Sequence, residues 1–117
     1  MFRKDNGFSA KLLMQFNVLY LTTDDTSMTL QNVIPLSRSI ERAVEDHCPK
    51  KLVLDLRNIE RLDSSGFGVI INTYSKCKSK NCDFAVMNIN EKIERLFKIT
   101  QIEDIIIIIK SIDEFCK

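Results

Sequence analysis

The sequence has 117 residues, 44% hydrophobic and 28% charged, a composition typical of a globular protein that buries a core without metals or disulfides. Its 17 basic and 16 acidic residues are spread along the chain and give a net charge of +1, which argues against a nucleic-acid surface. The apolar run at 105–109 is far shorter than the ~20 residues that span a bilayer, and residues 1–6 lack the apolar region of a signal peptide. We therefore expect one cytoplasmic domain, residues 1–117, with no nucleic-acid partner and no membrane insertion.

The first part of the chain predicts two strands followed by a helix. Residues 8–23 are rich in apolar side chains and read as two strands with a turn at 15–17, before a polar loop at 24–27. In residues 33–47 apolar side chains recur at spacings of three and four, which indicates a helix that buries one face. Asn32 is a favourable N-cap for this helix.

The rest of the chain alternates strands with helices. A short apolar strand at 52–56 is followed by a polar loop and then by a helical pattern. Further strands are predicted at 84–87 and at 105–109, the latter buried on both faces. Asn90 is expected to cap the helix between them, and a short last helix begins near Ile112. The apolar faces of the two later helices are Phe67, Ile70, Ile71, Tyr74 and Cys77 in one, and Ile93, Leu96 and Phe97 in the other.

This alternation predicts an α/β sandwich with a mixed, largely parallel sheet of four to five strands and about four helices. Such folds bind their partners at the carboxyl ends of the strands. The loop after the strand 52–56 lies at that edge.

The cysteines and the single histidine do not have the spacing of a metal site. Cys48, Cys77, Cys82 and Cys116 contain no CxxC pair, and His47 only adjoins Cys48. We expect reduced thiols and no metal or cofactor, with His47 at the edge of its helix's apolar face. Cys77 is expected to be a buried structural thiol.

The segment Asp63-Ser64-Ser65-Gly66-Phe67-Gly68 is the most informative part of the sequence, because it places a serine where a helix begins. The first N–H groups of a helix lack partners and its dipole favours an anion, so a phosphate on Ser64 or Ser65 would be accommodated. The simpler alternative is that Asp63 or Ser64 only caps the helix. However, Gly66 and Gly68 each disfavour a helix by roughly 1 kcal/mol, which suggests a surface that a partner approaches closely.

Catalysis by this segment is not supported. A nucleophile elbow needs glycine two residues before the serine, and Asp63 holds that position before Ser65. Only His47 could serve as the base, and no acidic residue evidently orients it. The glycines match neither the Walker nor the dinucleotide-binding spacing. We therefore expect a protein that is not an enzyme.

Three segments carry a resemblance to a known family. Seven residues separate the strand 52–56 from Ser64, which stands in Asp63-Ser64-Ser65-Gly66-Phe67-Gly68-Val69-Ile70. The segment Glu94-Arg95-Leu96-Phe97-Lys98-Ile99-Thr100 follows later. In these segments the chain resembles the STAS-domain anti-sigma-factor antagonists. The resemblance extends over about residues 8–115. The resemblance implies a single STAS domain with the family's α/β fold.

The resemblance also implies a function as a partner switch. In this family the unphosphorylated protein binds an anti-sigma factor that is also a serine kinase, which frees the sigma factor. Phosphorylation of the first serine of the motif ends the complex, and a metal-dependent serine phosphatase restores it. Here the acceptor would be Ser64, and residues 63–68 would form the partner-binding loop of a monomeric protein.

The resemblance leaves a second function open, that of a constitutive scaffold subunit in a phospholipid-transport ATPase or another signalling assembly. The chain also departs from the family pattern at two places. Thr26-Ser27-Met28-Thr29 replaces the usual Gly-x-Leu/Ile-Asp turn before the first helix, and Gln101 replaces the glycine that commonly follows the third helix.

Overall fold

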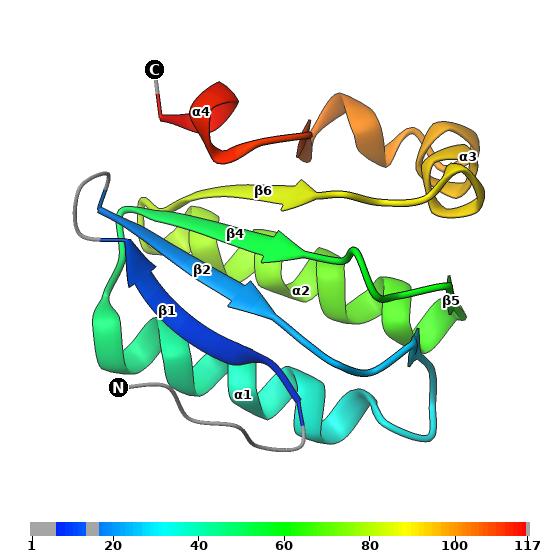
Figure 1. The fold of residues 1–117 in the computed structure, drawn as a ribbon, viewed down its shortest axis with the longest axis horizontal. Coiled ribbons are helices and arrows are strands. Elements are labelled where there is room, and N and C mark those ends of the chain that lie inside the picture. The colour runs from blue at the N-terminus through cyan, green and yellow to red at the C-terminus, as the bar shows by residue number, and fades with distance from the viewer. Residues whose placement is uncertain (1–6, 14–16, 117) are drawn as a thin grey trace.

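The computed structural model describes residues 7–13 and 17–116, which are built around a five-stranded sheet (Figure 1). The strands are β1 (Ser9–Leu13), β2 (Val18–Thr22), β4 (Lys51–Asp55), β6 (Asp83–Met87) and β7 (Ile107–Ile109). Their order is β1-β2-β4-β6-β7; β1 and β2 are antiparallel, and the other neighbours are parallel. The mixed, largely parallel α/β sheet predicted from the sequence is confirmed.

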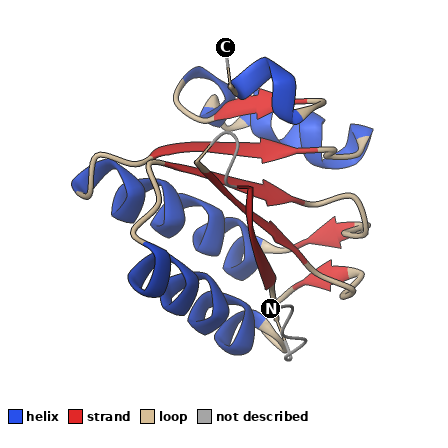
Figure 2. Ribbon diagram, turned by 60° about the vertical axis from the view of Figure 1, so that its left-hand side comes forward, coloured by secondary structure: helices blue, strands red, loops and turns tan. Residues whose placement is uncertain are grey.

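The described residues form four α-helices and one 3-10 turn. They are α1 (Val33–His47), α2 (Ser64–Ser79), α3 (Glu91–Ile99), α4 (Ile112–Phe115) and the turn η1 (Ile102–Asp104). α1 and α2 lie next to each other on the same face of the sheet in both views (Figures 1 and 2). Two further strands, β3 (Ser27–Met28) and β5 (Arg61–Leu62), pair in parallel beyond the ends of β2 and β4 (Figure 2).

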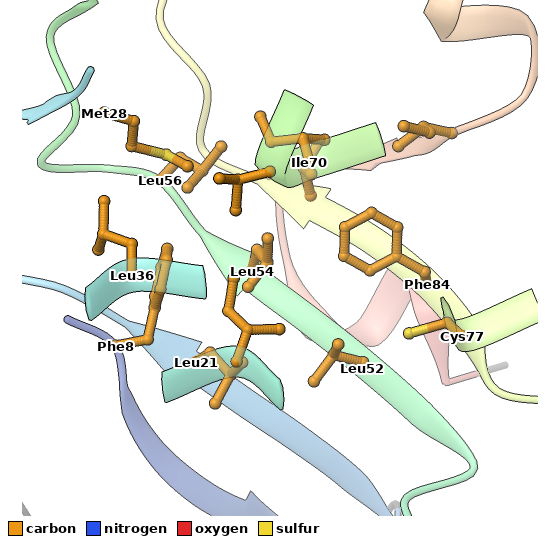
Figure 3. Close-up of a cluster of buried hydrophobic side chains, with 14 of the residues drawn as sticks. Phe8, Leu21, Met28, Leu36, Leu52, Leu54, Leu56, Ile70, Cys77 and Phe84 are labelled. Atoms are coloured by element: carbon orange, nitrogen blue, oxygen red, sulfur yellow. The ribbon is translucent and has the colours of Figure 1, made fainter. Parts of the chain in front are cut away.

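The core lies mainly between the sheet and the α1–α2 layer, because alternate side chains of each strand face opposite sides. Leu52 and Leu54 of β4 belong to this large cluster (Figure 3). Val53, between them, faces a smaller cluster that includes Phe115 of α4. The Lys51 ammonium donates a hydrogen bond to the Phe115 carbonyl oxygen at 2.8 Å, which ties α4 to the start of β4.

Several local predictions are confirmed. α1 has the bounds that the apolar spacing indicated, and β1 and β2 form the predicted antiparallel pair. Of the turn predicted at 15–17, only Asn17 lies within the described residues, and it has a positive φ of 54°. Asn90 caps α3: its side-chain oxygen accepts a hydrogen bond from the Ile93 N–H at 2.8 Å.

The prediction of a strand at 105–109 buried on both faces is wrong. β7 contains only residues 107–109 and is at the edge of the sheet. Ile106 and Ile109 are buried, but Ile105 and Ile107 are 49% and 48% exposed. A run of isoleucines indicates an apolar segment, but it does not reveal that only one side has a neighbouring strand.

Two predictions about α1 are also wrong. His47 is exposed, and its Nδ1 lies 3.0 Å from the Ala43 carbonyl oxygen instead of packing on the apolar face. Asn32 precedes α1 without capping it. Its side chain closes the preceding turn instead, accepting from the Thr29 N–H and donating to the Ser27 carbonyl oxygen, both at 2.8 Å.

No helix in residues 7–13 and 17–116 is both long and apolar enough to cross a membrane. Within the same residues there is no group of three or more His, Cys, Asp or Glu side chains that could hold a metal ion.

Gln101 occupies a left-handed backbone conformation, with φ of 61°, which glycine adopts more readily than other residues. This conformation costs a residue with a side chain roughly 1–2 kcal/mol, partly offset by the greater chain entropy that glycine loses on folding. We expect Gln101→Gly to raise the free energy of unfolding by about 0.5–1 kcal/mol in urea titrations. Gln31→Gly, at an exposed position without positive φ, is the control and should not stabilise. An equal effect of both changes would contradict this explanation.

Candidate functional site

The predicted site lies where the chain passes from β4 to α2, at the carboxyl edge of the parallel strands. β5 runs just before the site and pairs with β3, so the loop is held on both sides. The Asp63 N–H donates to the Met28 carbonyl oxygen at 3.1 Å, which fixes the start of α2 against β3. Ser64 is the first residue of α2.

Asp63 is the N-cap of α2, as the capping interpretation proposed. Its Oδ1 accepts from the Gly66 N–H at 3.0 Å, and its Oδ2 accepts from the Leu30 N–H at 3.0 Å. The hydrogen bond from Gly66 is the largest cause, and that from Leu30 the next, of a pKa of Asp63 below its usual value. The exposed carboxylate therefore stays charged at neutral pH and joins α2 to the turn before α1.

Ser64 is exposed and Ser65 is half-buried. Because Asp63 supplies the side-chain cap, the start of α2 does not need the Ser64 hydroxyl for that purpose. An exposed hydroxyl at the amino end of a helix suits a group that exists both free and phosphorylated.

The two glycines of the segment have different environments. Gly66 is buried, and a Cβ on it would lie only 2.1 Å from the Met28 carbonyl oxygen, so this glycine permits close packing of α2 on β3. The sequence-based explanation that Gly66 clears space for a partner therefore missed its packing role. A Cβ on Gly68 would meet nothing within 4 Å. Since Gly68 is four residues after Ser64, it lies on the same side of the helix and leaves open space beside the hydroxyl.

Phe67, also in the predicted binding loop, is half-buried and packs against the core. Its ring contacts Phe97 of α3 edge-on, with ring centroids 5.7 Å apart and an angle of 73° between the planes. The loop is thus anchored to α3 as well as to β3.

Apolar side chains that the sequence analysis did not select lie on one side of the site. Leu30 is 74% exposed and Ile34 is 62% exposed, although the backbone of Leu30 is bonded to Asp63. Ile34 could have been found in the sequence, because it lies outside the three-and-four spacing of the buried face of α1. Large exposed apolar patches mark surfaces that bind other proteins.

On the other side of the site, a groove of about 260 Å³ runs between β5 and α3. Its lining combines apolar side chains with three cations: Arg61, Leu62, Lys92, Ile93, Arg95, Leu96 and Ile99. Ile99 is 74% exposed. The groove begins at Leu62, two residues before Ser64, so it continues the surface of the site.

A separate polar cluster surrounds Asp55 at the end of β4. Asp55 is 1% exposed and accepts hydrogen bonds from Tyr20, from Arg57 at 2.9 Å (Nε) and from Asn88 at 3.3 Å. Burial by itself would raise the pKa of Asp55, but the hydrogen bonds from Arg57, Tyr20 and Asn88 together lower it below 3.8. Burial and the Asp55 carboxylate raise the pKa of Tyr20 to about 12. In the sequence, the only indication of this cluster is a carboxylate within an apolar strand.

The Asp55 cluster makes a testable contribution to stability. Because the folded-state pKa of Asp55 is depressed, its stabilisation is present above the unfolded-state pKa near 3.8 and is lost as pH falls through the folded-state pKa. We expect Asp55→Asn to lower the free energy of unfolding at pH 7 by about 2 kcal/mol. The difference from wild type should shrink steadily below about pH 4. Urea titrations at pH 7 and pH 3 measure both, and a pH-independent difference would contradict the assignment.

Comparisons with known proteins agree with this fold. A family model described as "STAS domain" matches residues 17–115, which is most of the chain. The chain therefore belongs to the STAS-domain family.

Curated relatives align over part of the chain. Proteins from Thermotoga maritima and Thermotoga neapolitana are 36% identical over 64 residues, which cover 55% of this chain and 57% of each relative. The anti-sigma F factor antagonist of Paenibacillus polymyxa is 34% identical over 71 residues, covering 56% of this chain and 61% of that protein. The chain thus spans less than two thirds of the length of these relatives.

Solved structures share the whole fold. The Thermotoga maritima protein TM1081 has a TM-score of 0.75 at 26% identity, covering 90% of this chain and 82% of that one. An anti-sigma-factor antagonist (STAS) domain protein from Planctomyces limnophilus has a TM-score of 0.81 at 14% identity, covering 97% of each chain. The second likeness concerns the fold alone.

Proposed function

We propose that this protein is an anti-sigma-factor antagonist that works by partner switching and has no catalytic activity of its own. Its unphosphorylated form binds an anti-sigma factor that is also a serine kinase, phosphorylation of Ser64 releases that partner, and a metal-dependent serine phosphatase reverses the step. The protein acts as a cytoplasmic monomer. The relative from Paenibacillus polymyxa, an anti-sigma F factor antagonist, supports an anti-sigma factor as the partner.

The observation that carries the proposal is the position of Ser64. It is an exposed hydroxyl at the first residue of α2, beside an N-cap formed by a different side chain. A kinase can therefore reach the hydroxyl without opening the helix. The open space left by Gly68 on the same side of α2 supports close approach of a partner.

The surface around Ser64 supports docking of a protein rather than a small molecule. Exposed Leu30 and Ile34 lie on the α1 side, and the β5–α3 groove lies on the other. Arg61, Lys92 and Arg95 in that groove favour a partner segment that combines apolar anchors with carboxylates. A partner that covers both sides would bury Ser64 at the centre of the contact, where an added charge matters most.

Affinity purification tests the proposal. Wild type, Ser64→Ala and Ser64→Asp proteins are used as baits in the source bacterium, and the bound proteins are identified by mass spectrometry. We expect wild type and Ser64→Ala to retain an ATP-binding serine kinase, and Ser64→Asp to lose it. Retention of transporter subunits by all three baits, without phosphate on Ser64, would instead establish the scaffold function and overturn the switch.

A further inference from the structure

The carboxyl end of α2 brings two cysteines together. Asn81, just beyond the last helical residues, has a φ of 57°, and its N–H donates to the Lys78 carbonyl oxygen at 3.3 Å. The Cys82 N–H donates to the Cys77 carbonyl oxygen at 2.8 Å. These two bonds and the left-handed residue define a Schellman motif, which packs the side chains at the positions of Cys77 and Cys82 against each other. In this protein both of those side chains are thiols.

The two thiols share one buried environment. Cys77 is 1% exposed and Cys82 is 5% exposed, and both belong to the large core cluster, where Cys77 lies near Phe84 (Figure 3). Their side chains are within hydrogen-bonding reach of each other. A disulfide needs the two Cα atoms close together, usually 4.4–6.8 Å apart. The hydrogen bond from the Cys82 N–H to the Cys77 carbonyl oxygen holds the two residues next to each other across the turn.

The two thiols differ in acidity. The hydrogen bond with Cys77 lowers the pKa of Cys82, while the same contact, together with burial, raises the pKa of Cys77. Since the thiolate is the reactive form of cysteine, the lower pKa favours Cys82 as the nucleophile of the pair, and Cys82 is also the thiol that lines a surface groove.

Cys82 lies at the edge of the core, next to a groove on the surface. This residue lines an open groove of about 340 Å³ between the end of α2, the start of β6 and the exposed isoleucines before and within β7. Tyr74, Lys78 and Asp83 line the same groove, and the Asp83 carboxylate opposes the effect of Cys77 by raising the pKa of Cys82. Cys77 lies behind Cys82 in the core and is not among the residues that line this groove.

We propose that Cys77 and Cys82 form a reversible disulfide when the folded protein meets a hydroperoxide such as hydrogen peroxide. The Cys82 thiolate attacks one peroxide oxygen, the O–O bond breaks, and hydroxide leaves while Cys82 becomes a sulfenic acid. The Cys77 sulfur then attacks the Cys82 sulfur, its proton goes to the departing hydroxyl, and water is released. Overall, two thiols lose two electrons and two protons, and the peroxide is reduced to two water molecules. A dithiol reductant reverses the bond.

The test uses the 117-residue chain with Cys48→Ser and Cys116→Ser, so that only this pair of thiols remains. The reduced protein is treated with hydrogen peroxide, quenched in acid and alkylated, and its intact mass is measured. We expect loss of two hydrogen atoms, no alkylation, and a proteolytic fragment that joins the peptides of Cys77 and Cys82. Reduction by dithiothreitol should restore two alkylatable thiols, and circular dichroism should show the fold unchanged throughout.

Single variants in the same background separate the roles of the two residues. Cys77→Ala should leave a sulfenic acid on Cys82 that dimedone traps, whereas Cys82→Ala should leave Cys77 unreactive while the protein is folded. The disulfide mapped in the parent protein does not depend on how well these variants fold. Alkylation of both thiols after peroxide treatment, gain of oxygen without a disulfide, or disulfide formation only in urea would overturn the proposal.

Discussion

Replacing Ser64 with aspartate is expected to weaken binding of the cognate kinase at least ~100-fold while leaving the fold intact. A phosphoserine carries a charge of about −1.5 to −2 at pH 7, and the amino end of a helix tolerates such a charge in the free protein. In the complex the same charge must be desolvated beside the Asp63 carboxylate, which the N–H groups of Gly66 and Leu30 keep ionised. A penalty of about 2.8 kcal/mol already corresponds to roughly 100-fold in affinity.

Calorimetric titration of the purified kinase with each variant measures this effect. Ser64→Ala should bind like wild type and resist inactivation by the kinase. Ser75→Asp, an exposed serine further along α2, adds the same charge away from the site and should keep wild-type affinity. Both aspartate variants should unfold within about 0.5 kcal/mol of wild type. Transfer of phosphate to Ser65, or equal binding of the phosphorylated and unmodified proteins, would refute the role of Ser64.

The elements that the sequence predicted correctly are those with local signals. The spacing of Leu36, Ile40, Ala43 and Val44 was enough for α1, because burial of one helical face requires that spacing. Asn90 was identifiable as a cap because its side chain bonds to a backbone group only three residues away. The edge position of β7 could not be predicted, because it depends on which strands pair across the sheet.

The candidate site shows the same division. That Asp63 caps α2 follows from its place in the sequence, and the structure confirms it. Its second hydrogen bond, to the Leu30 N–H, depends on β3 pairing with β5, two strands too short to leave a pattern. The position of the exposed Leu30 beside the site depends on the same pairing. The N-cap beside Ser64 can therefore be predicted from neighbouring residues, whereas the surface that would recognise a partner depends on contacts between distant segments of the chain.

Replacing Gly66 with alanine is expected to destabilise the protein strongly. The new Cβ would lie 2.1 Å from the Met28 carbonyl oxygen and 2.8 Å from the Met28 carbonyl carbon, and a backbone cannot move aside as a flexible side chain can. Overpacking of this kind costs roughly 1–3 kcal/mol or more, which exceeds the gain of about 1 kcal/mol from alanine's helix propensity. We expect a net loss of about 2 kcal/mol in urea titrations, with a melting temperature lower by roughly 8 °C.

Gly68→Ala is the matched control, since it makes the same change two residues later in the same helix. A Cβ there meets nothing within 4 Å, so the variant should gain about 0.5–1 kcal/mol of stability from helix propensity alone. Equal destabilisation by the two changes would show that close packing on Met28 is not what requires Gly66.

The control also separates folding from binding, because Gly68 lies beside Ser64 on the helix surface. If a partner fits closely there, Gly68→Ala should weaken kinase binding while it stabilises the free protein, a combination that loss of fold cannot produce.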